Sequence, residues 1–203
     1  MPTSQPYHRV HAIGGADLDA AADLLGRGMA DNPVHIAAYR GDETSRALRH
    51  GLLMRTLLRR SPSLQIEGVD RGEGLAGIAA WAPPGTCQPT PDARLHLLGR
   101  ALTFGPGTAA RLLTWTRAWA RHDPGAPHVH LGPVSVDRHL RGRGIGGFLL
   151  LRHVGRLDVA GVDGYLETDR PEAVGFYERF GYAVVDKTDV LGTRCWFMRR
   201  RAE

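Results

Sequence analysis

The fold of this 203-residue chain is decided by the stretch Val134-Ser135-Val136-Asp137-Arg138-His139-Leu140-Arg141-Gly142-Arg143-Gly144-Ile145-Gly146-Gly147. The pattern predicts a strand over 128–136, a glycine-rich turn, and a helix over 145–160. Main-chain N–H groups at such a helix start form an anion site when no side chain covers them. Arg141 and Arg143 add positive charge, so the stretch predicts a site for a pyrophosphate.

Two kinds of pyrophosphate ligand fit such a turn. Gly142, Gly144 and Gly147 match the dinucleotide fingerprint, and Glu167 lies 20 residues beyond Gly147, near where that motif has an acid for the ribose. In that motif, however, the glycines follow the strand almost at once, whereas the five residues 137–141 intervene here. Only 36 residues follow Glu167, too few for the rest of a doubly wound sheet. A dinucleotide site and a purely structural turn are therefore the minor alternatives.

Two motifs, about 35 residues apart, carry a family resemblance. The stretches 134–136 and 141–146 resemble the V-x-V strand and the R/Q-x-x-G-x-G/A turn of the GNAT acetyltransferases. The stretches 166–168 and 173–182 resemble the fifth strand and the F-Y-x-x-x-G-F/Y helix of that family. The second block, together with 80–83 and 194–198, is also similar to puromycin N-acetyltransferase and its relatives.

The resemblance implies an acyl-CoA-dependent N-acyltransferase with acetyl-CoA as co-substrate. In the family, the N–H groups of the turn hold the CoA pyrophosphate, and the free edge of the strand pairs with the pantetheine arm. The implied cofactor-binding residues are Val134, Ser135, Val136, Arg141, Gly142, Arg143, Gly144, Ile145 and Gly146. Two positions depart from the family pattern, because Arg138 stands where many members have Pro and Arg170 where many have Asn. The second change removes a side-chain amide from the pantetheine and can place a cation near a CoA phosphate instead.

The resemblance also implies the catalytic groups. Tyr177 is the expected acid for the leaving thiolate, because a phenol with a pKa near about 10 is protonated at neutral pH. The N–H of Val136 is the expected donor to the oxyanion. Glu167 is the expected base or anchor for the amine, and Asp169 is a weaker alternative. The competing interpretations are a tyrosine that only packs its helix and a strand glutamate that pairs with an arginine.

The rest of the chain predicts one α/β (α+β) domain over 1–203, with a mixed, partly parallel sheet of six to seven strands flanked by helices. A helical insertion at about 83–127 separates the third and fourth strands. Asp17 and Thr44 are the expected caps of the first two helices. The sequence Asp31-Asn32-Pro33 is expected to end the first of them. The expected strands cover 7–13, 63–70, 75–81, 128–136, 164–168, 182–189 and 194–199, and the expected helices cover 17–30, 44–60, 92–104, 108–122, 145–160 and 172–180.

Composition narrows the classes of function. With 42% apolar and 23% charged residues the chain is typical of soluble globular proteins, and no apolar run approaches the roughly 20 residues of a membrane span. Residues 1–6 have no signal-peptide pattern, so a cytoplasmic location is expected. The net charge of +5 comes from scattered arginines, which indicates a solvated surface. A nucleic-acid site on the arginine-rich segment 46–60 is the rival interpretation, and no nucleic-acid or membrane partner is expected.

The sequence leaves the acceptor open. A primary amine of a small molecule is expected, and Asn32, His35, Tyr39 and Trp81 are candidates to line its site. A non-catalytic acyl-CoA-binding sensor is the alternative function, and the protein is expected to be a monomer or homodimer.

No metal is expected from the sequence. Cys87 and Cys195 have no metal-binding spacing. His128 and His130 share one face of a strand, but no third ligand is visible near them in the sequence.

Overall fold

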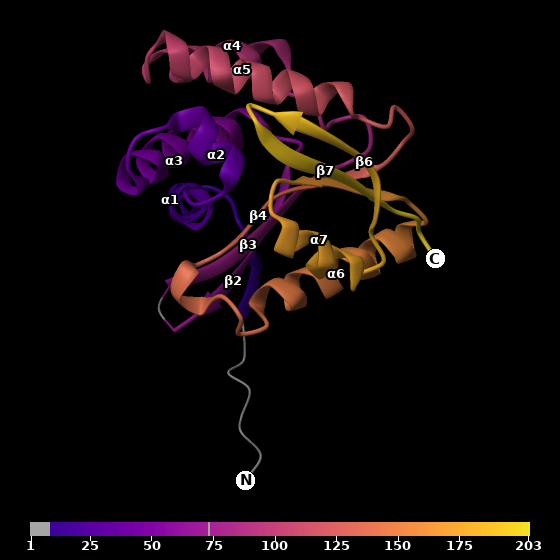
Figure 1. Cartoon of the computed structure of the whole chain (residues 1–203). Coiled ribbons are helices and arrows are strands. Elements are labelled where there is room, and N and C mark those ends of the chain that lie inside the picture. The colour runs from indigo at the N-terminus through magenta and orange to yellow at the C-terminus, as the bar shows by residue number, and fades with distance from the viewer. Residues whose placement is uncertain (1–8, 73) are drawn as a thin grey trace.

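The computed structural model describes residues 9–72 and 74–203 as a seven-stranded sheet flanked by helices (Figure 1). The strand order is β1-β2-β3-β4-β5-β7-β6. Every described pair of neighbouring strands is antiparallel except β4 and β5, which are parallel. The strands are β1 (Arg9–Ala12), β2 (Gln65–Arg71), β3 (Gly74–Ala82), β4 (Val129–Val136), β5 (Gly164–Thr168), β6 (Ala183–Val190) and β7 (Thr193–Arg200). The mixed sheet predicted from the sequence is confirmed.

The helices occupy the intervals between these strands. They are α1 (Asp17–Met29), α2 (Pro33–Tyr39), α3 (Glu43–Arg60), α4 (Pro91–Leu102), α5 (Pro106–Arg121), α6 (Ile145–Ala160) and α7 (Pro171–Glu178), with the short 3-10 turn η1 (Arg138–Leu140) before α6. Helices α4 and α5 form the predicted insertion between β3 and β4. In the described part of the chain, no helix is both long and apolar enough to cross a membrane.

Four local expectations were wrong or only partly testable. Helix α2 was not predicted, but a proline is well suited to the first turn of a helix, where its missing N–H is not needed, and Pro33 begins α2. Asp17 is the first residue of α1 and not its cap. The cap of α3 is Asp42, which accepts a hydrogen bond from the Ser45 N–H at 2.8 Å. The predicted strand residues 7–8, and residue 73 between the predicted strands 63–70 and 75–81, lie outside the described residues.

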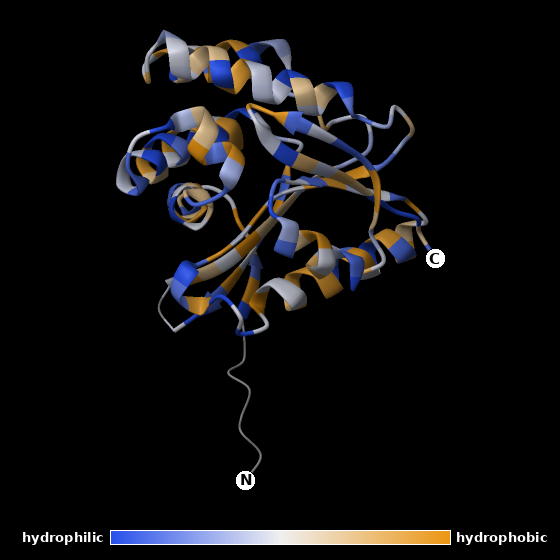
Figure 2. Ribbon diagram, viewed as in Figure 1, coloured by the Kyte–Doolittle hydropathy of each residue, from blue (hydrophilic) through white to orange (hydrophobic). Residues whose placement is uncertain are grey.

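The sheet has a hydrophobic core on each face. Because neighbouring strand residues point to opposite faces, Tyr165 packs with α2 and α5, whereas the adjacent Leu166 packs with α6. Helices α1 and α3 cover β2 and β3 on the same face as α2 and α5. Helices α6 and α7 cover the opposite face (Figure 1). Figure 2 shows apolar residues running along the central strands between these layers.

Glycines allow α1 to approach its neighbours closely. A Cβ atom at Gly26 would lie 2.4 Å from the Ala47 carbonyl oxygen of α3 and 3.0 Å from the Cα of Gly51. A Cβ at Gly28 would lie 2.0 Å from the Ser135 Oγ of β4. Helix α1 is therefore fixed against both α3 and the strand that precedes the glycine-rich turn.

This packing gives a stability prediction. We expect Gly26→Ala to lower the free energy of unfolding by about 1–3 kcal/mol, because the methyl group overpacks the α1–α3 contact. Gly155→Ala, at an exposed position of α6 with no atom near the new Cβ, should raise it by about 0.5–1 kcal/mol through helix propensity. Urea unfolding of both variants measures the difference, and equal effects of the two substitutions would contradict the packing argument.

Candidate active site

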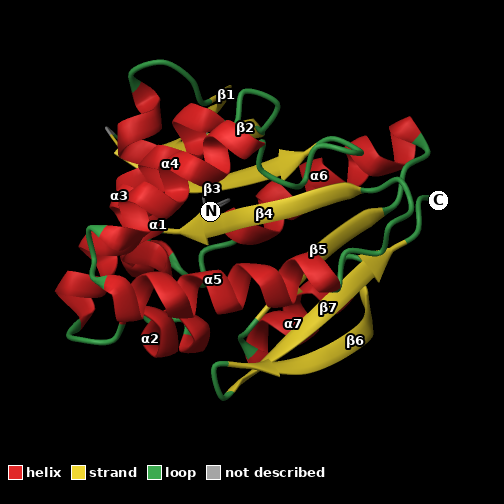
Figure 3. Cartoon of the chain, turned by 90° about the horizontal axis from the view of Figure 1, so that it is seen from above, coloured by secondary structure: helices red, strands yellow, loops and turns green. Residues whose placement is uncertain are grey.

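The strands β4 and β5 separate after two residue pairs. Within the described chain they pair only at Val129↔Gly164 and His130↔Tyr165. Beyond these pairs β4 continues along β3, and β5 continues along β7. Figure 3 shows the two strands diverging from their common start. A wedge therefore opens between them, with its closed apex at His130 and Tyr165.

A β-bulge in β4 contributes to this separation. Ala79 of β3 pairs with Val134 and Trp81 pairs with Leu131, so Gly132 and Pro133 together oppose the single residue between them. A bulge bends its strand and increases the local twist. From Leu131 onward, the edge of β4 facing the wedge has no described strand partner, and its main-chain groups are available to a ligand.

The predicted cofactor residues of β4 lie on this free edge with alternating orientations. Val134 and Val136 pack toward α6 and α7, whereas Ser135 faces α1. The Ser135 Oγ atom is buried and has no hydrogen-bond partner among the described residues.

The glycine-rich turn leads directly into α6. Gly142 and Gly144 have φ angles of 75° and 83°, which residues with a Cβ rarely adopt. Gly144 is the N-cap of α6 and makes no side-chain capping bond, and the first turn of α6 has no acidic residue. The N–H groups of the first helical turn, from Ile145 to Gly147, therefore have no partner within the helix. This is the predicted anion site, at the open end of the wedge.

The two sequence motifs meet in space at Gly146. A Cβ atom there would lie 3.5 Å from Cζ of Phe176 in α7 and 3.7 Å from Cγ2 of Val136 in β4. The start of α6 thus packs directly on the motif that contains Tyr177. The Tyr177 ring lies 5.3 Å from the Phe176 ring and 6.1 Å from the Tyr182 ring, within the core on the α6–α7 face.

Burial raises the pKa of Tyr177 to about 12, and the nearby Asp169 carboxylate adds to this effect. The phenol is therefore protonated throughout the neutral range. The structure places this phenol on the α7 side of the wedge, and its role as proton donor stays a prediction.

Arg141 does not extend freely toward the anion site. Its guanidinium group donates to the Asp31 carboxylate at 3.0 Å and to the Gly28 carbonyl oxygen, so it fastens the turn to the end of α1. Arg138 and Arg170 also contact Asp31, each at 3.3 Å. Burial alone would raise the pKa of Asp31, but the Arg141 and Arg170 guanidinium groups hold it well below its usual range. Arg141 and Arg143 are both exposed, but Arg141 is held by Asp31 and Gly28, whereas Arg143 has no ion-pair partner among the described residues.

Glu167 forms an ion pair at the apex of the wedge. His130 Nε2 donates to Glu167 Oε2 at 2.7 Å, and the Glu167 side chain is only 4% exposed. Burial alone would lower the pKa of His130, but the Glu167 carboxylate and the Cys87 thiol oppose it and raise the pKa to about 10. The side chains of Glu167 and Tyr165 share a strand face, so Glu167 points to the α2–α5 side, opposite Tyr177. Sequence reasoning identified Glu167 but missed His130 as its partner.

Asp169, the weaker alternative to Glu167, is a structural acceptor. Its carboxylate accepts the Val34 N–H at 2.6 Å and the Asn32 side-chain amide at 3.4 Å, which fixes the start of α2 on the end of β5. Burial raises the pKa of Asp169. Asn32 also accepts from Arg170 at 3.3 Å. Asn32 therefore joins the arginine cluster.

The other residues expected to line the acceptor site lie elsewhere. His35 and Tyr39 are 1% exposed, and both contact His50, His35 at 3.3 Å and Tyr39 at 3.1 Å. Trp81 packs on the opposite face of the sheet, with the Arg156 guanidinium 4.5 Å from its ring centre. The side-chain alternation of β3 separates Trp81 from α2, so Trp81 shares no surface with His35 and Tyr39. Contact of these three residues with the acceptor stays a prediction.

A pocket of about 300 Å³ does lie beside the apex of the wedge. Its walls come from the end of α3, the loop after β3 and the bulged part of β4. Cys87, His130 and Gly132 are among its lining residues. The volume is at the lower end of the range for small-molecule sites.

Comparisons with known structures identify this arrangement as the GNAT fold. A structure of "histone acetyltransferase HPA2 and related acetyltransferase" from Corynebacterium glutamicum superposes with a TM-score of 0.72 at 23% identity over 97% of each chain. The ribosomal-protein-S18-alanine N-acetyltransferase of Escherichia coli gives 0.55 at 14% identity over 97% of this chain and 95% of that one. An N-acetyltransferase from Staphylococcus aureus gives 0.58 at 13% identity over 97% and 99%. At these identities the likeness establishes the fold alone.

The sequence comparison covers the candidate site. Residues 106–184 match the family described as Acetyltransferase (GNAT) domain. The matched segment runs from α5 through β4, α6 and β5 to α7 and the start of β6. It therefore contains the wedge, the glycine-rich turn and Tyr177.

The turn geometry gives a binding prediction. Gly144 and Gly161 both have left-handed backbones, at the two ends of α6, so each change to alanine should cost about 1–2 kcal/mol of stability. Only Gly144→Ala should weaken CoA binding, by about tenfold, because it alone disturbs the N–H groups at the wedge. Calorimetric titration with CoA measures the affinities. Equal losses of CoA affinity in both variants would show that the turn is not part of the binding site.

Proposed function

We propose that this chain is an acyltransferase that moves the acetyl group of acetyl-CoA to a primary amine of a small molecule. The observation that carries this proposal is the wedge between β4 and β5, with the free N-terminus of α6 at its open end and Tyr177 on its α7 side. The family match over residues 106–184 supports the same class of reaction.

The wedge offers a binding surface for each part of acetyl-CoA. The N–H groups at the start of α6 bind the pyrophosphate, and the exposed Arg143 adds charge beside them. The pantetheine arm lies along the unpaired edge of β4 from Val136 toward Leu131, replacing the strand that β5 does not supply. This path brings the thioester toward the apex, between the Tyr177 face and the Glu167 face.

The transfer itself is a direct attack. The lone pair of a neutral amine forms a bond to the acetyl carbon, and a main-chain N–H nearer the Leu131 end of the unpaired β4 edge donates to the oxyanion that develops. Val136, the donor expected from the family resemblance, lies at the pyrophosphate end of this path. The carbon–sulfur bond then breaks and the CoA thiolate receives the phenol proton of Tyr177. The extra proton on the nitrogen passes to the Glu167 carboxylate, directly or through water, and solvent returns a proton to the Tyr177 phenolate. The high pKa of Tyr177 means that this proton is present whenever the amine arrives.

Glu167 is proposed to hold the acceptor amine. His130 engages its Oε2 atom, which leaves Oε1 to accept an N–H of the substrate. The pocket of about 300 Å³ that adjoins His130 is the proposed acceptor site, and its size favours a small molecule over a polypeptide. The narrower similarity to puromycin N-acetyltransferase stays a prediction about which amine binds there.

The role of Tyr177 is tested by Tyr177→Phe. We expect thiol release from saturating acetyl-CoA to slow by about 10²-fold, because the variant has no proton for the leaving thiolate. The matched control is Tyr182→Phe, whose hydroxyl bonds to His153 at 3.1 Å and is buried in the same core. It should lose stability but keep its rate.

The assay follows thiol release with aminonucleosides, polyamines and simple primary amines as acceptors. An unchanged rate in Tyr177→Phe would exclude the proton-donor role. Tight CoA binding without turnover on any acceptor would favour the acyl-CoA sensor over the enzyme.

The role of Glu167 is tested by Glu167→Gln. With the best acceptor of that panel, we expect the KM for the amine to rise by about tenfold while the KM for acetyl-CoA is unchanged, because a neutral amide binds an amine more weakly than a carboxylate. Glu172→Gln, at an exposed carboxylate bound to Arg170, is the control and should leave both constants unchanged. An amine KM equal to that of the unmodified protein would exclude Glu167 as the anchor.

A further inference from the structure

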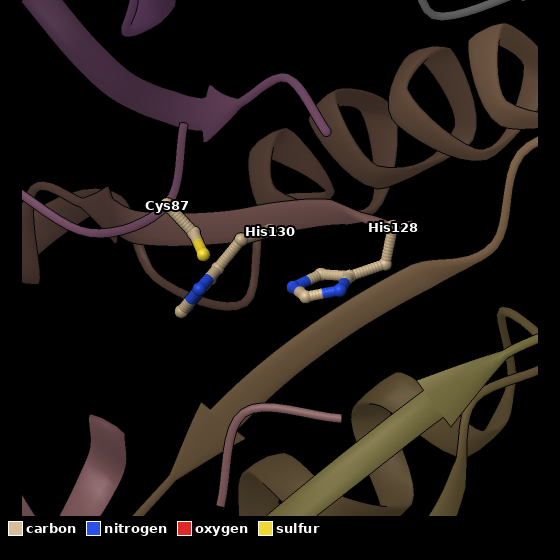
Figure 4. A group of neighbouring side chains, drawn as sticks. All are labelled: Cys87, His128 and His130. Atoms are coloured by element: carbon tan, nitrogen blue, oxygen red, sulfur yellow. The ribbon is translucent and has the colours of Figure 1, made fainter. Parts of the chain in front are cut away.

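We propose that Cys87, His128 and His130 bind a divalent transition-metal ion of the zinc class. One ligand atom from each residue lies within 4.8 Å of the other two. Figure 4 shows the thiol of Cys87 and the two imidazole rings gathered around a common space. Cys87 comes from the loop after β3, 41 residues before His128, so sequence spacing could not reveal the third ligand.

His128 has the geometry of a metal ligand. Its Nδ1 atom lies 2.8 Å from the Ala126 carbonyl oxygen, which can only accept, so Nδ1 carries the hydrogen and Nε2 has a free lone pair. The side chain is 4% exposed, and Nε2 is buried without a hydrogen-bond partner among the described residues. An unsatisfied buried acceptor costs about 1–3 kcal/mol, and coordination of a metal would remove that cost.

His130 has the partner expected of a metal-bound histidine. Its Nε2 bonds to the Glu167 carboxylate, so a ligand bond through Nδ1 leaves that contact intact. Carboxylates and backbone carbonyls that hold the second nitrogen of a histidine are the usual outer partners of metal sites. Both histidines of the cluster have such a partner, Ala126 for one and Glu167 for the other.

The donor set selects the kind of ion. A thiolate with two imidazoles favours zinc and its neighbours over magnesium or calcium. Bond lengths near 2.3 Å to sulfur and 2.0–2.1 Å to nitrogen place tetrahedral ligands roughly 3.3–3.6 Å apart, so small side-chain rotations close the cluster. Binding exchanges the Cys87 thiol proton and the Nδ1 proton of His130 for the metal, whereas His128 Nε2 has no proton to lose. Asp123, whose Oδ2 accepts from Cys87 at 3.0 Å, is the proposed carboxylate for the fourth position.

The position of the cluster gives the ion a structural role. Cys87 lies near the start of the helical insertion, and Asp123 and His128 lie near its end, so one ion would tie both ends to β4. Cys87 and His130 also line the pocket of about 300 Å³, which provides an entry path for the metal. The glycine-rich turn lies at the other end of β4, so CoA binding does not depend on this site.

The test uses the full chain without a polyhistidine tag, stripped with a chelator and titrated with Co²⁺ under reducing conditions. We expect one equivalent of cobalt per chain, with a sulfur-to-metal charge-transfer band and the strong visible bands of a four-coordinate site. Zinc should displace the cobalt and raise the thermal midpoint of unfolding. Glu167→Gln should weaken cobalt binding by about 10–100-fold through the loss of the outer carboxylate.

Matched variants separate this site from adventitious binding. Cys87→Ser and His128→Gln should each abolish the one-equivalent site, whereas Cys195→Ser and His96→Gln should retain it. Retention of the charge-transfer band in Cys87→Ser, or the absence of stoichiometric binding in the unmodified protein, would overturn the proposal. CoA affinity, measured on the same samples, reports separately on the proposed acyltransferase function. Since His128→Gln retains Glu167, its amine KM shows whether the metal contributes to acceptor binding.

Discussion

The geometry of the candidate site depends on where the β4–β5 hydrogen-bond ladder stops. Two pairs hold the strands together, and the bulge at Gly132 and Pro133 then turns β4 away from β5. An unpaired strand edge inside a sheet is normally costly, because each buried N–H and C=O group needs a partner. A ligand with amide groups along its length resolves that cost, and the helix that begins at Ile145 adds an anion site at its end. The fold thus creates the binding surface by leaving a strand pair incomplete.

One carboxylate, that of Asp31, pairs with the arginines at the open end of the wedge. Asp31 lies at the end of α1, where three arginines from η1, the turn before α6 and the β5–α7 connection converge on it. Ion pairs of this partly exposed kind contribute little stability one by one, but a shared network fixes geometry. It holds the glycine-rich turn and the start of α7 against α1 while leaving Arg143 exposed. The basic character of the chain is therefore concentrated, at this point, beside the groups proposed to bind phosphate.

Local patterns in the sequence were sufficient for the strands, for both motifs and for every helix except α2 and the short η1. The bounds of α6 and β5 were predicted as observed, because apolar periodicity and flanking glycines specify them. Contacts between segments that are distant in the sequence could not be predicted from these local patterns. Nothing local shows that Arg141 bonds to Asp31, 110 residues earlier, or that His130 neutralises Glu167. The face that Trp81 occupies could not be predicted, because an alternating strand gives two equivalent faces until the sheet order is known.

The polar groups at the apex are difficult to explain by stability alone. A buried ion pair such as His130–Glu167 is weak evidence for stability, because desolvating both charges offsets most of their attraction. The same region contains the orphaned Nε2 atom of His128 and the Cys87 thiol, all on the α2–α5 face of the sheet. On the opposite face the wedge is lined by Tyr177 and apolar side chains. A core optimised only for stability would place apolar residues on both faces. The asymmetry follows if one face receives a polar acceptor, or the ion beside it, while the other face supplies a single proton to the thioester between them.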